Sequence, residues 1–153
     1  MYGRPHGIYS RHERRKLLSS EHPIIGSLPI GTNLDVVKCR QTVRQLAQGL
    51  DMSAIGECML VTAASELARN TLVHGGGGRF SWEVISVGAR RGLRLTFEDD
   101  GPGIPDLERA MTNGWSSGHG LGLGLPGAKR LVNEFEVQSR PGHGTRVVIA
   151  RWL

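Results

Sequence analysis

One helical segment carries a carboxylate and an amide one turn apart, in the stretch Glu66-Leu67-Ala68-Arg69-Asn70. With Thr62 and His74, these two residues recur every fourth position and form one polar stripe. Glu66 could accept a proton from a hydroxyl or water that attacks a phosphate, and the Asn70 oxygen suits magnesium, which prefers few protein ligands plus phosphate and water. The alternative is the solvated side of an amphipathic helix, in which His74 simply orients or caps the helix end.

A first glycine-bearing phrase, Asp99-Asp100-Gly101-Pro102-Gly103, follows a predicted strand. The strand ends in acids and the chain turns sharply, while Gly101 and Gly103 allow the backbone to come close to a flat ligand. One of the two acids could accept a hydrogen bond from an exocyclic amine, which distinguishes adenine from guanine. The alternative is an ordinary acidic turn after a strand.

A second phrase places glycine at every second position immediately before a predicted helix, from Gly118 to Gly124. Backbone N–H groups there could converge on phosphate oxygens, helped by the positive end of the helix dipole. The candidate residues are Gly120, Leu121, Gly122, Leu123, Gly124 and Leu125. The phrase is not a Walker loop, because it contains no Gly-Lys-Ser or Gly-Lys-Thr. It is not a Rossmann turn either, because no parallel βαβ pattern surrounds it. A flexible apolar hinge is the alternative, and one loop can serve both purposes.

The third phrase, Gly142-His143-Gly144-Thr145, completes an ordered series. Sixteen of the 22 glycines lie between Gly75 and Gly144, which favours a functional backbone surface over random flexibility. Together with the carboxylate and amide on the helix, the three phrases predict a site for ATP and magnesium.

The elements that must position these residues are predicted from hydrophobic spacing and from helix and turn signals. A short apolar stretch, 24–30, is broken by Gly26 and Pro29 and predicts only an edge strand. One helix is expected from Gly31-Thr32-Asn33 to Gly49, and a longer one from about Ser53 to about His74. The four glycines at 75–78 end this second helix.

Two hairpins and two short helices are expected in the remaining chain. Apolar and polar side chains alternate over 79–87 and 92–98, and again over 134–140 and 145–152, so each pair predicts a β-hairpin. One or two helical turns are expected over 106–111, and a helix from Leu125 to Val132 with Pro126 in its first turn. Helices gathered on one face of a mixed or antiparallel sheet make an α+β two-layer sandwich, which is the predicted fold class.

Length and charge indicate one domain with a basic extension. The 153 residues suffice for a single core, so we expect a disordered arm over residues 1–23 and one domain over 24–153. Met1 to Lys16 carries five basic residues against one glutamate, and the remaining chain is close to neutral at +1. Because no basic stripe with interleaved aromatics follows, we expect no nucleic-acid partner. A binder of nucleic acid through the arm stays as a minor alternative.

Hydropathy and cysteine usage point to an intracellular protein. No apolar run is long enough to cross a bilayer and no signal peptide is recognisable, so we expect a cytoplasmic location and no membrane partner. The two cysteines, Cys39 and Cys58, lie on predicted helices, and we expect both to be reduced and buried.

The ordered phrases resemble the GHKL superfamily of ATP-binding proteins, which includes gyrases, heat-shock chaperones, histidine kinases and mismatch-repair ATPases. The helical stretch from Glu66 to Asn70 resembles its N box, and the three glycine phrases resemble its glycine boxes. The resemblance implies a Bergerat-type ATP-binding fold in which residues 104–118 form a short lid over ATP. Gyrases and chaperones need further domains, and a sensor kinase needs a phosphoacceptor histidine helix that is not recognisable here.

Within that superfamily the chain resembles the anti-sigma-factor serine/threonine kinases, and among these the stressosome switch kinases. The resemblance covers about Leu28 to Leu153 and rests on three passages: Ser65-Glu66-Leu67-Ala68-Arg69-Asn70, Glu98-Asp99-Asp100-Gly101-Pro102-Gly103-Ile104-Pro105-Asp106, and Gly122-Leu123-Gly124-Leu125-Pro126-Gly127. It implies that Glu66 is the general base, Asn70 the magnesium ligand and Asp99 the adenine reader. It implies for Thr145 a polar contact near adenine or phosphate.

The same resemblance implies a function and its partners. We expect a protein kinase that transfers the γ-phosphoryl group of ATP to a small STAS-domain antagonist protein in a partner-switching pathway. A PP2C-type phosphatase or a sigma factor is a further expected partner, and the sequence leaves the oligomeric state open. The alternative is a partner-binding switch, either an anti-sigma factor or a phosphatase activator, in which ATP sets binding affinity with little or no catalysis.

Overall fold

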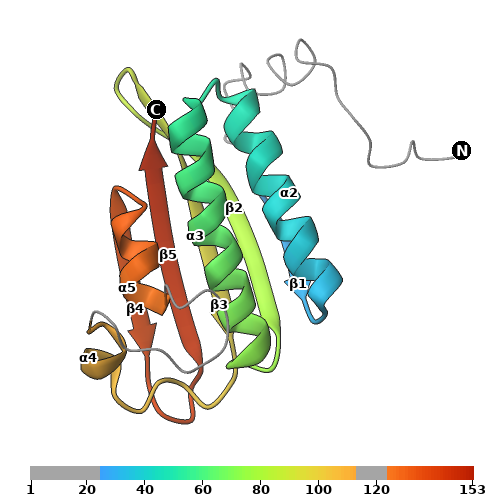
Figure 1. Cartoon of the computed structure of the whole chain (residues 1–153), viewed down its shortest axis with the longest axis vertical. Coiled ribbons are helices and arrows are strands. Elements are labelled where there is room, and N and C mark those ends of the chain that lie inside the picture. Colours follow the sequence, from blue (N-terminus) through green and yellow to red (C-terminus); the bar gives the residue numbers. More distant parts are fainter. Residues whose placement is uncertain (1–24, 113–123) are drawn as a thin grey trace, which may run out of the picture.

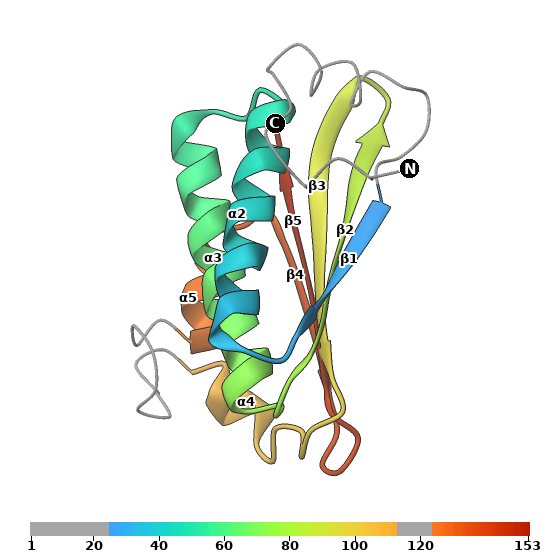
Figure 2. The same cartoon turned by 90° about the vertical axis from the view of Figure 1, so that its right-hand side faces the viewer.

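Two long helices and two short ones cover one face of a five-stranded sheet in the computed structural model, which describes residues 25–112 and 124–153 (Figures 1 and 2). Every strand pair is antiparallel, and the strand order is β1-β2-β3-β5-β4. The strands are β1 (Ile25–Ile30), β2 (Gly78–Val87), β3 (Arg90–Asp99), β4 (Glu134–Ser139) and β5 (Thr145–Trp152). The predicted α+β sandwich is confirmed, as are the two hairpins and the edge position of the first strand.

Helix α2 (Asn33–Gly49) begins at the predicted position, with a capping box. The Thr32 hydroxyl accepts a hydrogen bond from the backbone N–H of Asp35, and the Asp35 carboxylate accepts one in return from the Thr32 N–H. These reciprocal bonds satisfy backbone donors that have no partner within the helix. The same carboxylate also accepts from Gly31, and these backbone bonds lower the pKa of Asp35.

Helix α3 (Ala54–Val73) begins after Ser53, whose hydroxyl accepts a hydrogen bond from the Gly56 N–H. It lies across the sheet, packs against α2 on one side and against α5 on the other, and ends at His74 before the glycine run. The predicted start and end of this helix are confirmed.

The short helices differ slightly from expectation. Helix α4 spans Leu107–Ala110 and α5 spans Gly124–Arg130, so α5 ends two residues before the predicted Val132. The chain must turn there to enter the sheet: the Leu131 N–H bonds to the Ala128 carbonyl, and the Asn133 N–H already bonds to Ala150 on β5. Pairing with the neighbouring strand therefore overrides a helical pattern that continues in the sequence.

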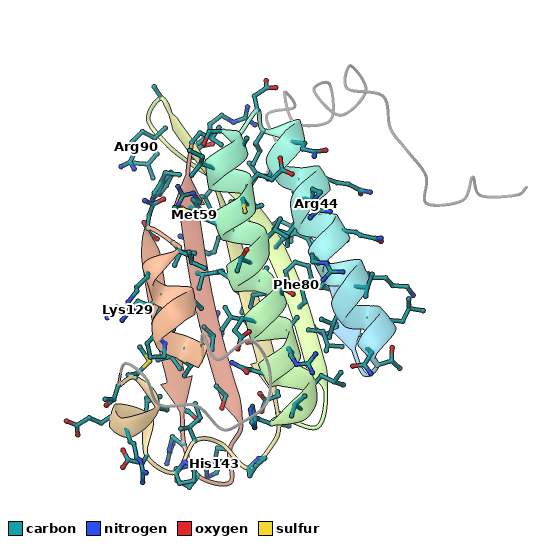
Figure 3. The ribbon with its side chains drawn as sticks, viewed as in Figure 1. Arg44, Met59, Phe80, Arg90, Lys129 and His143 are labelled. Atoms are coloured by element: carbon teal, nitrogen blue, oxygen red, sulfur yellow. The ribbon has the colours of Figure 1, made fainter. Side chains whose placement is uncertain are left out.

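The core lies between the helices and the sheet. Phe80 on β2 and Phe97 on β3 stack with ring centroids 5.2 Å apart, and the side chain of Phe80 lies beneath the helices (Figure 3). Cys39 is buried in this core as expected, but Cys58 is exposed on the solvent side of α3, so the prediction that both cysteines are buried is wrong for Cys58. Among the described helices, none combines the length and apolar character that a bilayer crossing requires.

Candidate active site

A cavity of about 180 Å³ is lined by residues from the ends of α3 and β3 and the start of β5. These element ends lie at the same end of the molecule (Figure 1). Residues far apart in the sequence line the cavity, because the sheet brings these element ends together. The lining residues are Glu66, Leu67, Asn70, Thr71, His74, Gly75, Phe97, Asp99, Gly103, Ile104, Pro105, Ala110, Gly124, Leu125, Thr145 and Val147.

The polar stripe of α3 divides into a buried and an exposed part. Glu66 is only 5% exposed and lines the cavity, with Asn70 one turn further on and partly exposed. No hydrogen bond between described residues ends on the Glu66 carboxylate. Thr62 instead donates to the Cys58 carbonyl, and its side chain does not line the cavity. The alternative of a simply solvated stripe is therefore wrong for Glu66, because α3 turns that position toward the sheet.

Asp99 is the acid of the first glycine phrase that faces the cavity, whereas Asp100 is exposed. Burial raises the pKa of Asp99 most, and the nearby Asp100 charge adds to the effect. Backbone N–H groups of Gly101 and Thr145 donate to the Asp99 carboxylate and oppose that shift, as does the charge of His74. The carboxylate is thus held by two backbone donors while it borders a mostly apolar cavity.

Gly75 makes a contact that sequence reasoning missed, since the glycine run was interpreted only as a helix end. A Cβ atom at Gly75 would overlap the Asp99 side chain, and a Cβ at Gly101 would lie 2.7 Å from the Gly75 backbone. Gly101 does not line the cavity, but its backbone N–H donates a hydrogen bond of 3.0 Å to the Asp99 carboxylate. The only available signal was the position of a glycine directly after the polar stripe.

The third glycine phrase brings β5 up to the same carboxylate. Gly144 has a φ of +76°, and a Cβ there would overlap the backbone carbonyl of Asp99. This close backbone approach places Thr145 opposite Asp99 in the sheet register, and both residues line the cavity.

Only part of the second glycine phrase is described. Gly124 and Leu125, at the start of α5, line the cavity. Gly120, Leu121, Gly122 and Leu123 lie outside the described residues, as do residues 113–118 of the expected lid and the whole basic arm.

The apolar wall of the cavity was not singled out by sequence reasoning. Leu67, Phe97, Ile104, Ala110 and Val147 line the cavity. A mostly apolar cleft with a few oriented polar groups is typical of small-molecule sites and suits a flat aromatic ring. Among residues 25–112 and 124–153, no cluster of three or more His, Cys, Asp or Glu side chains could hold a metal ion by itself. A metal here would need further ligands, such as phosphate oxygens.

A family model described as histidine kinase-, DNA gyrase B-, and HSP90-like ATPase matches residues 57–152. The chain belongs to this ATPase family. The match includes α3 from Glu57 onward, both hairpins and every described residue of the cavity.

Two curated relatives narrow the activity. The serine/threonine-protein kinase RsbT of Bacillus subtilis is 41% identical over 124 residues, which cover 81% of this chain and 93% of RsbT. An anti-sigma F factor of Clostridium novyi is 31% identical over 98 residues, which cover 60% of this chain and 68% of that protein. The chain is accordingly an ATP-using serine/threonine-protein kinase of the partner-switching type.

A solved structure supports the fold. The crystal structure of the RsbU and RsbW domains of a Mycobacterium tuberculosis protein superposes with a TM-score of 0.55 at 17% identity, covering 85% of this chain and 31% of that one. At this level of identity the likeness shows a shared architecture.

Proposed function

We propose that this kinase transfers the γ-phosphoryl group of ATP to a serine or threonine hydroxyl of a small STAS-domain protein. The observation that carries the proposal is one cavity that gathers a buried carboxylate, Glu66, an amide, Asn70, and a second acid, Asp99. The kinship to a serine/threonine kinase and to anti-sigma factors supports a small protein of a switching pathway as the acceptor.

In this proposal the base of ATP lies against the apolar wall. Asp99 accepts a hydrogen bond from the exocyclic amine of adenine, and Thr145 adds a polar contact beside it. Gly103 lets the chain turn beside the cavity, because it has a φ of +73° and a Cβ there would overlap the Arg140 carbonyl. A larger residue at Gly103 would displace the turn that borders the cavity.

The phosphates extend from the base toward the start of α5. We assign their binding to backbone N–H groups of the second glycine phrase, from Gly120 to Leu125, where a helix begins. Magnesium fits the donor set, since Asn70 offers one neutral oxygen in the cavity and the phosphates would supply the remaining charge. When bound, the ion would neutralise charge that develops on the phosphate oxygens.

Glu66 is the proposed general base. Its carboxylate takes the proton of the attacking hydroxyl as the oxygen of that hydroxyl bonds to the γ-phosphorus. The bond from the γ-phosphorus to the bridging oxygen then breaks, and ADP leaves with that oxygen. Glu66 is only 5% exposed, which keeps bulk water from competing for its carboxylate. Helix α3 carries both Glu66 and Asn70 and so fixes their spacing.

The remaining assignments follow from the same kinship. We propose that residues 24–153 form the kinase domain and residues 1–23 a separate basic arm, that the protein acts in the cytoplasm, and that a PP2C-type phosphatase or a sigma factor is a further partner.

Transfer of label tests this function. Full-length protein would be mixed with magnesium, γ-labelled ATP and a purified STAS-domain protein from the same genome, and the acceptor site would be mapped by mass spectrometry. We expect stoichiometric label on one serine or threonine of the acceptor. Tight ATP binding without any transfer to such proteins would refute the proposed acceptor class.

A second function, an ATP-gated binder without catalysis, is favoured by the anti-sigma relative. Binding of the acceptor to Glu66→Ala protein separates the two possibilities. If the variant binds its partner with unchanged affinity and the biological switch still operates, binding is the output; if the switch fails, transfer is.

A further inference from the structure

One face of the sheet is left open by the helices, and no other described element covers it (Figure 2). Side chains alternate between the two faces along a strand, so the neighbours of the core residue Phe97 point to this open face. The acids in its middle are paired: Glu98 with Arg146 at 2.8 Å, and Glu83 with Arg94 at 3.5 Å. These acids are therefore already neutralised.

The acids at the edge of the open face have no such partner. Glu134 and Glu136 lie on β4, point to the open face and are exposed. Glu134 accepts a hydrogen bond from the Trp152 indole and Glu136 accepts one from the Gln138 amide, and both donors are neutral. In the described part of the chain, no arginine or lysine forms an ion pair with either glutamate. The β4 edge thus presents two uncompensated negative charges.

The chain enters β1 in line with these acids. Ile25, the first residue of β1, and Glu134 stand at the two ends of one register row. The row runs through Glu83, Arg94 and Ala150. Four strand spacings separate its ends, which is about 19 Å. Lys16 precedes Ile25 by nine residues, which span up to about 30 Å when extended, so the basic end of the arm can reach β4.

The charges along the arm match the charges along that row. Segment 17–24 carries one charged residue, Glu21, and would cross the part of the face whose acids are already paired. Its first two residues are leucines, which would lie over the half-buried Val148 and Trp152 of β5. The basic cluster Arg14-Arg15-Lys16 would then arrive at the unpaired acids.

We propose that the basic arm folds back across the open face of the sheet and pairs its cluster Arg14-Arg15-Lys16 with Glu134 and Glu136. A single exposed ion pair contributes little to stability. Three cations that face two acids form a stronger contact here, because the chain itself tethers the cluster at a high effective concentration. The docked arm covers a face that is otherwise open to other proteins. The inference does not depend on the proposed function, since neither glutamate lines the cavity.

Trypsin cleavage of the full chain tests the contact, because trypsin cuts after the basic residues of the arm. Combined Glu134→Gln and Glu136→Gln removes both charges and leaves the arm sequence unchanged. We expect the arm of this variant to be cut about fivefold faster than in the wild type at low salt. At about 1 M salt the two rates should agree, because the screening length falls to about 3 Å. Combined Glu57→Gln and Glu108→Gln, on the helix side, is the matched control and should behave as the wild type.

A reporter disulfide shows where the arm lies. Leu17→Cys on the arm and Gln138→Cys on the open face of β4 are combined with Cys58→Ser, which leaves the buried Cys39 as the one native thiol. We expect mild oxidation to cross-link the chain to itself, which a non-reducing gel shows as a monomer of altered mobility. Cross-linked dimers would instead place the arm of a second copy on this face and would overturn docking within one chain.

Charge reversal isolates the pairing. Reversal of the arm cluster by Arg14→Glu, Arg15→Glu and Lys16→Glu should lower the yield of this disulfide about fivefold. The further changes Glu134→Lys and Glu136→Lys should restore the yield, because they recreate the pairs with opposite signs. A yield that does not respond to the first reversal, or that the second does not restore, would contradict the proposal. So would equal trypsin cleavage of the wild type and the double glutamine variant. Thermal melting checks that each variant is folded.

Discussion

Gly75 lies so close to Asp99 that no side chain fits between them: a Cβ atom at Gly75 would come within 2.6 Å of the Asp99 Oδ2 atom. The end of α3 and the end of β3 are thereby held in backbone-to-side-chain contact at the mouth of the cavity. The contact limits where the carboxylate can point, and the backbone N–H groups of Gly101 and Thr145 also donate hydrogen bonds to it.

Gly75→Ala should weaken ATP binding, because the added methyl group must push the Asp99 carboxyl out of its position. We expect the Kd for ATP to rise about tenfold or more, as for the loss of a hydrogen bond to a charged group. Calorimetric titration measures this. Gly31→Ala is the matched control, because its Cβ would meet only the Asp35 carboxylate at an ordinary 3.7 Å. Equal affinity in the two variants would show that Asp99 does not contact the nucleotide.

Glu66→Gln should remove phosphoryl transfer while it leaves nucleotide binding largely intact. The amide matches the shape of the carboxylate but cannot take up a proton, so we expect the transfer rate to fall by about 10² to 10⁴ fold. Single-turnover transfer measures the rate, and calorimetry measures binding. Glu57→Gln on the same helix is the control, because Glu57 contacts Gln48 and Arg44 away from the cavity. Transfer by Glu66→Gln at the wild-type rate would exclude Glu66 as the base.

Asp99 should make stability depend on pH. Its pKa is raised above 3.8, chiefly by burial, so the folded chain binds more protons than the unfolded chain in the range just above that value. The stabilising contribution is therefore complete below the unfolded pKa and is lost as the pH rises through the folded pKa. Asp99→Asn has no such titration.

Urea denaturation of both proteins across a pH series checks this. The free energy of unfolding of Asp99→Asn minus that of the wild type should increase from acid to neutral pH, because only the wild type loses stability at this site. A difference that stays constant with pH would contradict the raised pKa.

The two cysteines should react very differently with thiol reagents. Burial raises the pKa of the Cys39 thiol to about 12 and the side chain is 0% exposed, whereas Cys58 lies on the surface of α3. Because the thiolate is the reactive form, native protein should take up one label, on Cys58, and denatured protein two. Cys58→Ser should take up none until it unfolds. Rapid labelling of Cys39 in the native protein would mean that α2 does not pack as described.

Much of the fold could be predicted because its signals are local. Thr32 and Asp35 are three residues apart and cap α2 through their own side chains, and Ser53 begins α3 in the same way. The alternation over the two hairpins predicted their strands, and the spacing of Glu66 and Asn70 placed both residues on one helix. The ordered glycine phrases pointed to the ATPase family, which the family model confirms.

Where a local pattern competes with packing, the prediction failed. The helical spacing continues to Val132, yet α5 ends at Arg130 because Asn133 already pairs with β5. Cysteine is a residue type that is often buried, but Cys58 faces solvent, since the rotation of α3 on the sheet decides which positions are covered.

The sequence by itself therefore determined the elements, their caps and the residue types of the site, because helix and turn signals act between residues a few positions apart. Only the tertiary structure decided that Glu66 is buried, that Gly75 abuts Asp99, and that the Ser139 hydroxyl holds Ile104 from 35 residues away. Those relationships depend on strand register and on how closely separate segments of backbone approach each other. Such distances exist only once the helices are packed on the sheet.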